Sequence, residues 1–308
     1  KKNATAQDYF IVPLKKNSLL KTNRYHWAAA NAQKTTATTR QGIYRALKLR
    51  YFKNANVFEL GLQLDKEIAM AAAKKIKVEC THVVVSQNLL PFIFESGALG
   101  GRTFDVLMTR LPIEKLQQRL DVAYLKFKDS VTLKDFRATQ HLIDLENKAL
   151  TRAQKIITPH SDIADVFKNK VEKLNWHMPR ATGENKKGHK VLFPASALGR
   201  KGAYEMKQLA KELNLQISIL GNATEKINFW EDIKTEKFTG DFNEIGLVIY
   251  PTYIEHQPRQ ILKAIAQHIP VITTTACGIE PGDKITIIEI GNYEQLKKEV
   301  EERLKVMV

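Results

Sequence analysis

Residues 247–279 read LVIYPTYIEHQPRQILKAIAQHIPVITTTACGI, and this stretch decides the fold. An apolar run ends at Tyr250, a polar loop with Glu255 follows, and Pro258 opens a helical pattern. A second apolar run then covers residues 270–273. The order predicts strand, loop, helix and strand. It places Glu255 at the carboxyl end of a parallel strand, where open α/β sheets bind their ligands.

The helix that begins after Pro258 predicts an anion site beside Glu255. Its first backbone N–H groups, including those of Arg259 and Gln260, lack partners within the helix. A helix N-terminus with free N–H groups attracts phosphate. We therefore expect these groups to face the same edge of the sheet as Glu255.

A glycine-bounded basic loop lies upstream, at residues 195–202 (ASALGRKG), between a predicted strand and a predicted helix. Gly199 and Gly202 let the backbone approach a phosphate, and Arg200 and Lys201 supply positive charge. Alone, such a loop is as consistent with a solvated turn as with a ligand loop. The Glu255 segment downstream in the same domain favours the ligand loop.

Together these segments resemble the donor site of retaining glycosyltransferases of the GT-B fold, in particular family 4. The positions shared with that signature are Pro251, Glu255, Pro258, Arg259, Leu262, Ala264, Ala266, Pro270, Val271 and Ile272. The resemblance implies an α/β chain of two Rossmann-like domains that face each other across a cleft. It implies transfer of a sugar, with retention, from a nucleotide-diphosphate sugar to a glycan or lipid-linked acceptor, with no metal and no cofactor besides the donor substrate.

The resemblance also implies roles for single residues. Glu255 would orient the donor sugar, and Lys201, which matches the family's lysine, would stabilise the departing diphosphate. Arg200 does not match the family's arginine, but it would supply that positive charge from a different position. The nucleotide would be bound by Gly199, Gly202, Pro258, Arg259, Gln260 and Lys263.

Several positions depart from the family signature. His256 and His268 replace glycines, and Ala195 stands where the family has an arginine. Lys263 replaces the second glutamate, which the family uses for the nucleotide ribose, and an ammonium group can only donate hydrogen bonds. Two alternatives therefore stay open: a degenerate domain that binds nucleotide or glycan without turnover, and another GT-B enzyme such as an epimerase or a phosphorylase.

The chain length of 308 residues predicts two domains. Residues 175–189 lose periodicity and gather Pro, Gly and charge, which indicates a linker. We expect an acceptor-side domain at 1–175, incomplete because no glycine-rich turn follows its first strand, and a nucleotide-sugar domain at 176–308. Residues 146–161 resemble the last helix and strand of the family's first domain, with Ser161 as the N-cap of the next helix.

Other patterns predict individual elements. Expected strands are 9–12, 81–85, 104–108 and 216–220, and expected helices are 65–77, 142–155 and the amphipathic 293–308. Residues 55–64 fit either strand or loop. Phe229, Trp230 and Phe238 fit the core better than a lid over the base.

The composition predicts a water-soluble protein of a reducing compartment. The apolar share is 44% and the charged share 26%, as in ordinary globular chains. Cys80 and Cys277 lie far apart and are expected to be buried free thiols. No signal peptide or membrane span is recognisable, so the expected location is the cytoplasm.

Positive charge is concentrated near the N-terminus. Residues 1–53 hold 12 Lys and Arg against one Asp, a net charge of +11. Such an excess indicates a polyanionic partner. No nucleic-acid-binding motif is visible, so an anionic membrane surface is expected instead. Within residues 40–53, Ile43, Leu47 and Tyr51 recur at helical spacing, which fits a membrane-binding helix or an ordinary surface helix equally well.

Overall fold

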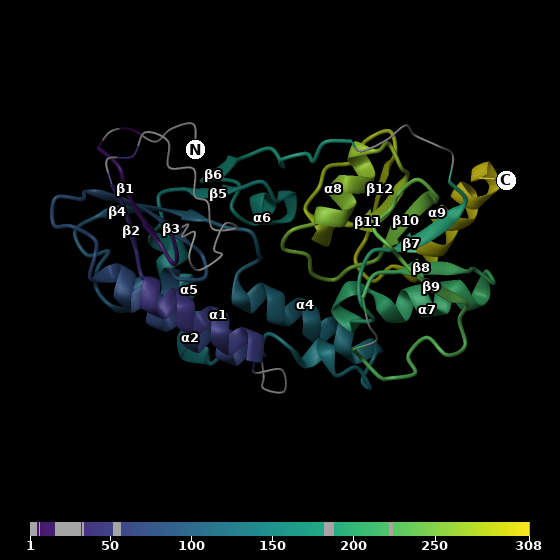
Figure 1. Cartoon of the computed structure of the whole chain (residues 1–308), viewed down its shortest axis with the longest axis horizontal. Helices are drawn as coiled ribbons and strands as arrows, with labels where there is room; N and C mark the ends of the chain where they lie inside the picture. The colour runs from purple at the N-terminus through teal and green to yellow at the C-terminus, as the bar shows by residue number, and fades with distance from the viewer. Residues whose placement is uncertain are drawn as a thin grey trace. The chain divides into compact units, whose positions relative to one another are not determined.

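The computed structural model describes residues 5, 7–15, 32, 34–51, 57–181, 188–221 and 224–307 (Figure 1). Contacts divide the chain into two compact units. The first unit comprises Lys1–Leu107 and Phe136–Lys155, and the second comprises Met108–Asp135 and Ile156–Val308. The predicted linker at 175–189 includes residues 182–187, which lie outside the described residues, and the division at 175/176 stays a prediction.

The first unit combines parallel strand pairs with helices. Strand β1 (Tyr9–Val12) pairs with β2 (Lys34–Ala37), and β3 (His82–Ser86) pairs with β4 (Thr103–Leu107), both in parallel. The helices of this unit are α1 (Thr39–Tyr51), α2 (Val57–Ala73), α3 (Leu90–Glu95) and α5 (Gln140–Arg152). The strands predicted at 9–12, 81–85 and 104–108 and the helix predicted at 142–155 are confirmed to within three residues at each end.

Residues 57–64 are helical, so the prediction of strand or loop for 55–64 was wrong over these residues. They form the first half of α2, which ends at Ala73. The buried positions Leu64, Ile68 and Ala72 recur every four residues. The helix therefore buries one face. It begins closer to the N-terminus than the alanine-rich part of the sequence indicated.

In the second unit, strands β5 (Ile156–Thr158) and β6 (Val171–Lys173) pair in parallel. The same unit contains α4 (Ile113–Lys126), the 3-10 turn η2 (Thr132–Lys134) and α6 (Ser161–Val166). Ser161 is not the N-cap: it is the first residue of α6, and His160 is the cap residue. The Ser161 hydroxyl instead donates to the carbonyl oxygen of Ile279, at 3.4 Å.

The rest of the second unit contains a parallel sheet with the order β12-β11-β10-β7-β8-β9, six strands in the described residues. Numbered along the chain from β7, this is the order 3-2-1-4-5-6 of a Rossmann fold, read from the other edge. The strands are β7 (Lys190–Phe193), β8 (Ile217–Ile219), β9 (Thr235–Lys237), β10 (Ile245–Tyr250), β11 (Val271–Thr274) and β12 (Ile285–Ile288).

Continuous apolar runs explain why these strands are central. In β10 only Gly246 is not fully buried, as expected for a parallel strand covered on both faces. The covering helices are α7 (Ala203–Glu212), α8 (Arg259–Ala266) and α9 (Tyr293–Met307), which run along the sheet in Figure 1. The predicted core positions Phe229, Trp230 and Phe238 and the predicted apolar face of 293–308 are confirmed, since these aromatics, Leu296 and Val300 are buried in this core.

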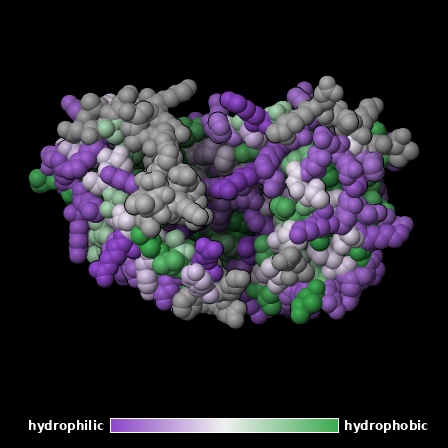
Figure 2. Space-filling model, in the orientation of Figure 1, coloured by the Kyte–Doolittle hydropathy of each residue, from purple (hydrophilic) through white to green (hydrophobic). Residues whose placement is uncertain are grey.

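The surface carries few large apolar areas on the face that Figure 2 shows, where hydrophobic residues stand in separate groups among hydrophilic ones. None of the helices in the described ranges combines the length and the apolar character that a membrane span requires. Both cysteines are free, as predicted, but Cys80 is only partly buried while Cys277 is fully buried.

Gly202 is required where the β7–α7 loop crosses the β10 loop. Its φ is +79°, and a Cβ there would lie 2.1 Å from the carbonyl oxygen of Pro251. We expect Gly202→Ala to lower the free energy of unfolding by roughly 3 kcal/mol. Urea unfolding should therefore show a markedly lower midpoint. Gly97→Ala is the matched control, because Gly97 has a φ of +76° but open space around its Cβ position. Equal effects of the two substitutions would contradict the close approach.

Candidate functional site

The candidate site lies where the chain order of the six-stranded sheet reverses. Strands β7 and β10 are neighbours there, and their carboxyl ends lead into two loops. Residues 194–202 contain the 3-10 turn η3 (Gly199–Lys201), and residues 251–258 contain Glu255. Open α/β sheets bind ligands at such a switch point because the two loops leave in opposite directions.

Lys201 and Glu255, which the sequence assigned to one site, are in direct contact. The Lys201 ammonium lies 2.9 Å from Glu255 Oε2 and also donates to the carbonyl oxygen of Ile254 at 2.8 Å. The two side chains are only 18% and 14% exposed. The Tyr250 hydroxyl donates to the same carboxylate oxygen at 2.5 Å. This pair ties the β7 loop to the β10 loop.

Backbone groups fix the other oxygen of Glu255. The N–H groups of His256 and Gln257 donate to Oε1 at 2.8 Å and 2.9 Å. Burial raises the pKa of Glu255, but the Lys201 charge and the hydrogen bonds from Tyr250, Lys201 and Gln257 outweigh it and lower the pKa to about 2. The carboxylate is therefore ionised at neutral pH.

Arg200 is placed beside this pair but faces another carboxylate. Its guanidinium lies 2.5 Å from Asp135 Oδ2, and its side chain is 19% exposed. Its carbonyl oxygen accepts from the N–H groups of Tyr253 and Ile254 at 3.0 Å and 3.3 Å. These backbone bonds hold the β10 loop against the basic loop.

Glu225 was not predicted from the sequence, although its carboxylate accepts a hydrogen bond from the backbone of the basic loop. The Gly199 N–H lies 2.5 Å from Glu225 Oε1 and 2.8 Å from Thr132 Oγ1. Glu225 is 6% exposed. Nothing in the local sequence identifies it, because its partners lie up to 95 residues away along the chain.

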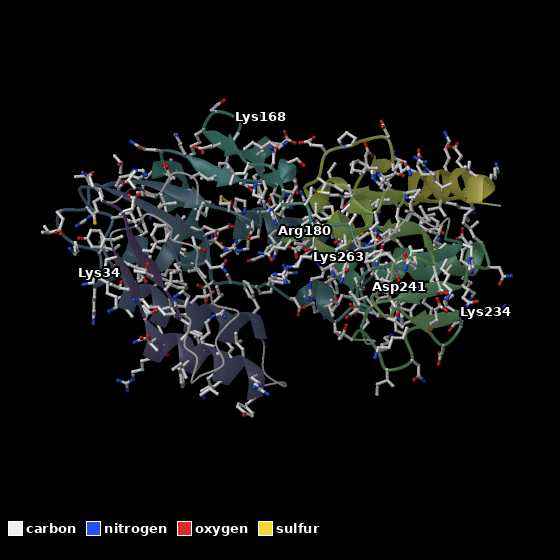
Figure 3. The ribbon with its side chains drawn as sticks, turned by 45° about the horizontal axis from the view of Figure 1, so that its top comes forward. Lys34, Lys168, Arg180, Lys234, Asp241 and Lys263 are labelled. Atoms are coloured by element: carbon white, nitrogen blue, oxygen red, sulfur yellow. The ribbon has the colours of Figure 1, made fainter. Side chains whose placement is uncertain are left out.

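The α8 residues are placed less favourably than predicted. Pro258 is the cap residue, and the N–H of Arg259 is not free, because it donates to the carbonyl oxygen of Gln257 at 2.7 Å. Arg259 also donates through its guanidinium to Gln257 Oε1 at 2.6 Å. The buried Gln260 Oε1 has no hydrogen-bond partner among the described residues. Lys263 is exposed on the helix (Figure 3).

Consequently the structure brings together only part of the predicted set. Lys201, Glu255 and the flanking Arg200, Gly199 and Gly202 belong to one pair of loops. Within the described ranges, no hydrogen bond or ion pair joins Arg259 or Lys263 to Lys201 or Glu255. The nucleotide-binding roles given to the α8 residues stay predictions.

Two histidines belong to the surroundings of Glu255: the buried His160, which contacts the Glu255 loop, and the partly buried His256, which is part of that loop. His160 Nε2 lies 2.9 Å from the carbonyl oxygen of Glu255, so this nitrogen carries the proton. Burial lowers the pKa of His160, and burial with the nearby Lys201 charge lowers that of His256 to about 3. Gly278 makes room for the first ring, because a Cβ there would lie 2.1 Å from His160 Nδ1. His160 lies two residues after the end of β5 at Thr158, and this place close to a strand end was the available sequence signal.

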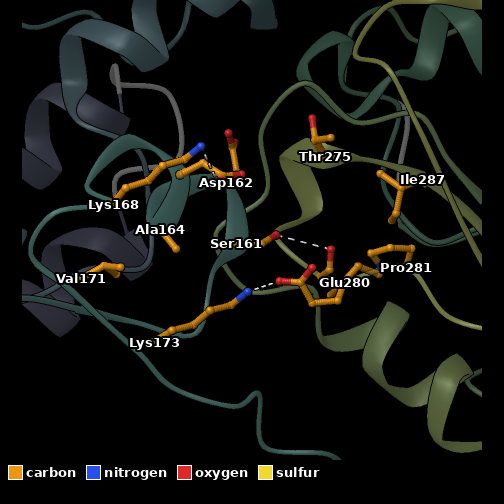
Figure 4. A pocket seen from close by; sticks show the side chains of 12 residues that line it. Ser161, Asp162, Ala164, Lys168, Val171, Lys173, Thr275, Glu280, Pro281 and Ile287 are labelled. Atoms are coloured by element: carbon orange, nitrogen blue, oxygen red, sulfur yellow. Dashed lines mark hydrogen bonds and ion pairs between the residues drawn. The ribbon is translucent and has the colours of Figure 1, made fainter.

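A cavity of about 430 Å³ lies elsewhere in the second unit (Figure 4). It is lined by α6, β6, η4 (Thr275–Cys277) and neighbouring residues, among them Ser161, Lys168, Lys173, Thr275 and Glu280. None of the predicted site residues lines it. In the part of the chain that the structure describes, no group of His, Cys, Asp and Glu is arranged to hold a metal ion.

The Glu255 contacts predict a pH-dependent contribution to stability. The folded pKa of about 2 lies below the ordinary 4.5, so the contribution is full above pH 4.5 and is lost as the pH falls toward 2. Urea unfolding should show Glu255→Gln less stable by roughly 2–3 kcal/mol at pH 7, with the difference shrinking below pH 4.5.

Glu280→Gln is the matched control, because Glu280 pairs with Lys173 where the side chains are 62% and 42% exposed. Its loss should cost about 0.5 kcal/mol or less. A Glu255→Gln difference that does not change between pH 7 and pH 3 would contradict the assigned ionisation.

No protein-family model matches the chain, and no curated protein matches it. Solved structures do match. The lipopolysaccharide outer core galactosyltransferase WaaB, in its apo form, gives a TM-score of 0.55 at 10% identity over 97% of this chain and 90% of its own. TarM gives 0.54 at 11% identity over 79% of this chain, which spans about half of TarM (52%).

HepE of Anabaena, solved in complex with UDP and glucose, gives a TM-score of 0.50 at 14% identity over 96% of this chain and 83% of its own. At these identities the likeness concerns the fold. The reversal of strand order between β7 and β10 and these matches agree with the resemblance seen in the sequence. The chain has the α/β fold of the GT-B glycosyltransferases.

Proposed function

We propose that this chain is a glycosyltransferase that transfers a sugar from a nucleotide-diphosphate sugar to a glycan or lipid-linked acceptor, with retention and without a metal. The observation that carries the proposal is the contact between Lys201 and Glu255 at the switch point of the sheet. The UDP and glucose in the HepE structure, which has the same fold, support this class of donor.

Lys201 has the donor capacity that a diphosphate needs. An ammonium group has three N–H donors. Ile254 and Glu255 take two of them, which leaves one for a phosphate oxygen. In this scheme Lys201 and Arg200 stabilise the negative charge that develops on the departing diphosphate, because preorganised cations act most strongly in a partly buried site.

Glu255 has less free hydrogen-bond acceptor capacity than the proposed role requires. Each carboxylate oxygen accepts about two hydrogen bonds. Oε1 accepts from His256 and Gln257, and Oε2 accepts from Lys201 and Tyr250. A donor-sugar hydroxyl must therefore displace or share one of these donors.

This saturation favours a second candidate function, in which the domain binds a nucleotide or glycan without turnover. A carboxylate held by four internal donors acts first as a structural anchor between two loops. Lys263 also favours the second candidate, because it stands in place of a ribose-binding carboxylate and an ammonium cannot accept hydrogen bonds from the ribose. The diphosphate would then carry most of the nucleotide affinity.

A panel of nucleotide-diphosphate sugars, incubated with the full chain, separates the two candidates. Under the first proposal, one of them releases its nucleoside diphosphate by transfer or slow hydrolysis. Lys201→Ala should lower that rate by about 100-fold or more. Lys207→Ala is the control, because Lys207 lies one turn into α7 and pairs with Asp232. Tight binding of a nucleotide sugar without any release would support the second candidate and contradict the first.

We also propose that the first unit binds an anionic membrane surface, which would bring the enzyme to a lipid-linked acceptor at the cytoplasmic face. Helix α1 carries an exposed stripe of Tyr44, Leu47 and Tyr51, with exposed fractions of 43%, 49% and 71%. Arg40 and Arg50 are exposed on the same helix. Apolar side chains bordered by cations are typical of helices that lie in the membrane interface.

Vesicle binding tests this surface. The chain should bind vesicles with anionic lipid, and binding should fall steeply with salt, because exposed charges are screened over about 10 Å at 0.1 M. Replacing Tyr44, Leu47 and Tyr51 by serine should weaken binding about tenfold or more. Val122→Ser with Leu125→Ser is the control, because these side chains are exposed on α4 of the other unit. Equal binding to neutral and anionic vesicles would refute the proposal.

A further inference from the structure

Residues 127–135, which follow α4, are packed against the basic loop within the second unit. The ring of Phe127 stacks on that of Tyr204, with centroids 4.7 Å apart and an interplanar angle of 16°. At the other end of the segment, Asp135 pairs with Arg200 at 2.5 Å. The segment therefore contacts both the start of α7, where Tyr204 lies, and the loop that carries both cations of the proposed donor site.

Glu225 joins the middle of this segment to the loop. Its carboxylate accepts from the Ser130 hydroxyl at 3.0 Å, from the Val131 N–H at 3.0 Å, and from the Thr132 hydroxyl. It also accepts from the Gly199 N–H. A buried carboxylate with this many donors is expensive to remove, so this part of the contact is fixed.

Three anion-binding groups of the loop thus already contact an internal carboxylate. Gly199 faces Glu225, Arg200 faces Asp135, and Lys201 faces Glu255. A diphosphate needs these same donors and carries like charge. It can use them fully only where a carboxylate withdraws.

Asp135 is the carboxylate that can withdraw at least cost. Its side chain is 44% exposed, whereas that of Glu255 is 14% exposed, and Glu225 is 6% exposed as a whole residue. A carboxylate that is already half hydrated loses little when it returns to water. Asp135 is also the last residue before the chain enters the first unit, and Phe136 beyond it has a φ of +61°.

We propose that Asp135 is an internal counter-ion of Arg200 that the diphosphate of a nucleotide displaces, so that Asp135 sets the affinity of the site for its donor. This inference rests on the proposed donor site. The Arg200 guanidinium exchanges one oxyanion for another, with no change in its own charge. Without ligand, Asp135 neutralises the charge of Arg200, and it thereby weakens the binding of diphosphate.

Calorimetry with uridine diphosphate tests this inference. Asp135→Asn removes the competing charge and should bind uridine diphosphate about threefold to tenfold more tightly than the unchanged chain. Asp129→Asn is the matched control: Asp129 is exposed in the same segment, its substitution removes the same charge, and its affinity should stay within a factor of two. The gain should vanish when Arg200→Gln is added.

Three results would overturn the inference. Equal affinities for the Asp135→Asn and Asp129→Asn variants would show that only the net charge matters. Weaker binding by Asp135→Asn would show that Asp135 supports the loop rather than competing for it. Absence of uridine diphosphate binding in the unchanged chain and in all variants, each with an unaltered circular dichroism spectrum, would contradict the proposed donor site as well. The first two results leave the donor site standing.

Discussion

The ion pair between Lys201 and Glu255 is the contact on which the rest of the site depends. It joins two loops that leave neighbouring strands, β7 and β10, and each partner is held by further bonds. Breaking one partner leaves an uncompensated charge in a partly buried place, which costs several kcal/mol. The close crossing of Gly202 over Pro251 brings the loops near enough for the pair to form.

Internal ion pairs explain why the loops of this site are held together and why few of their donors are available to an anion. Arg200 and Lys201 are each neutralised by one carboxylate, and Glu225 takes the backbone N–H of Gly199. These contacts stabilise the loops without any ligand. They also mean that a nucleotide competes with the protein's own carboxylates. The contacts that stabilise the loops therefore lower the affinity for a nucleotide.

The sequence predicted what depends on local pattern. Continuous apolar runs marked the strands, and the residues that follow them, Lys201 and Glu255, were expected at one edge of a parallel sheet and are found there. Contacts between distant segments could not be predicted, because neither Glu225 nor Asp135 stands in a recognisable motif. The N–H of Arg259 was expected to be free, but the turn after Glu255 uses it for the carbonyl of Gln257.

A crystal structure of the full chain with uridine diphosphate tests the central claim most directly. The account predicts the diphosphate between the loop of residues 199–202 and the loop that holds Glu255, with phosphate oxygens within hydrogen-bond distance of Lys201 and Arg200. A nucleotide found instead in the cavity lined by Ser161 and Glu280, with the Lys201 and Arg200 ion pairs unchanged, would contradict it.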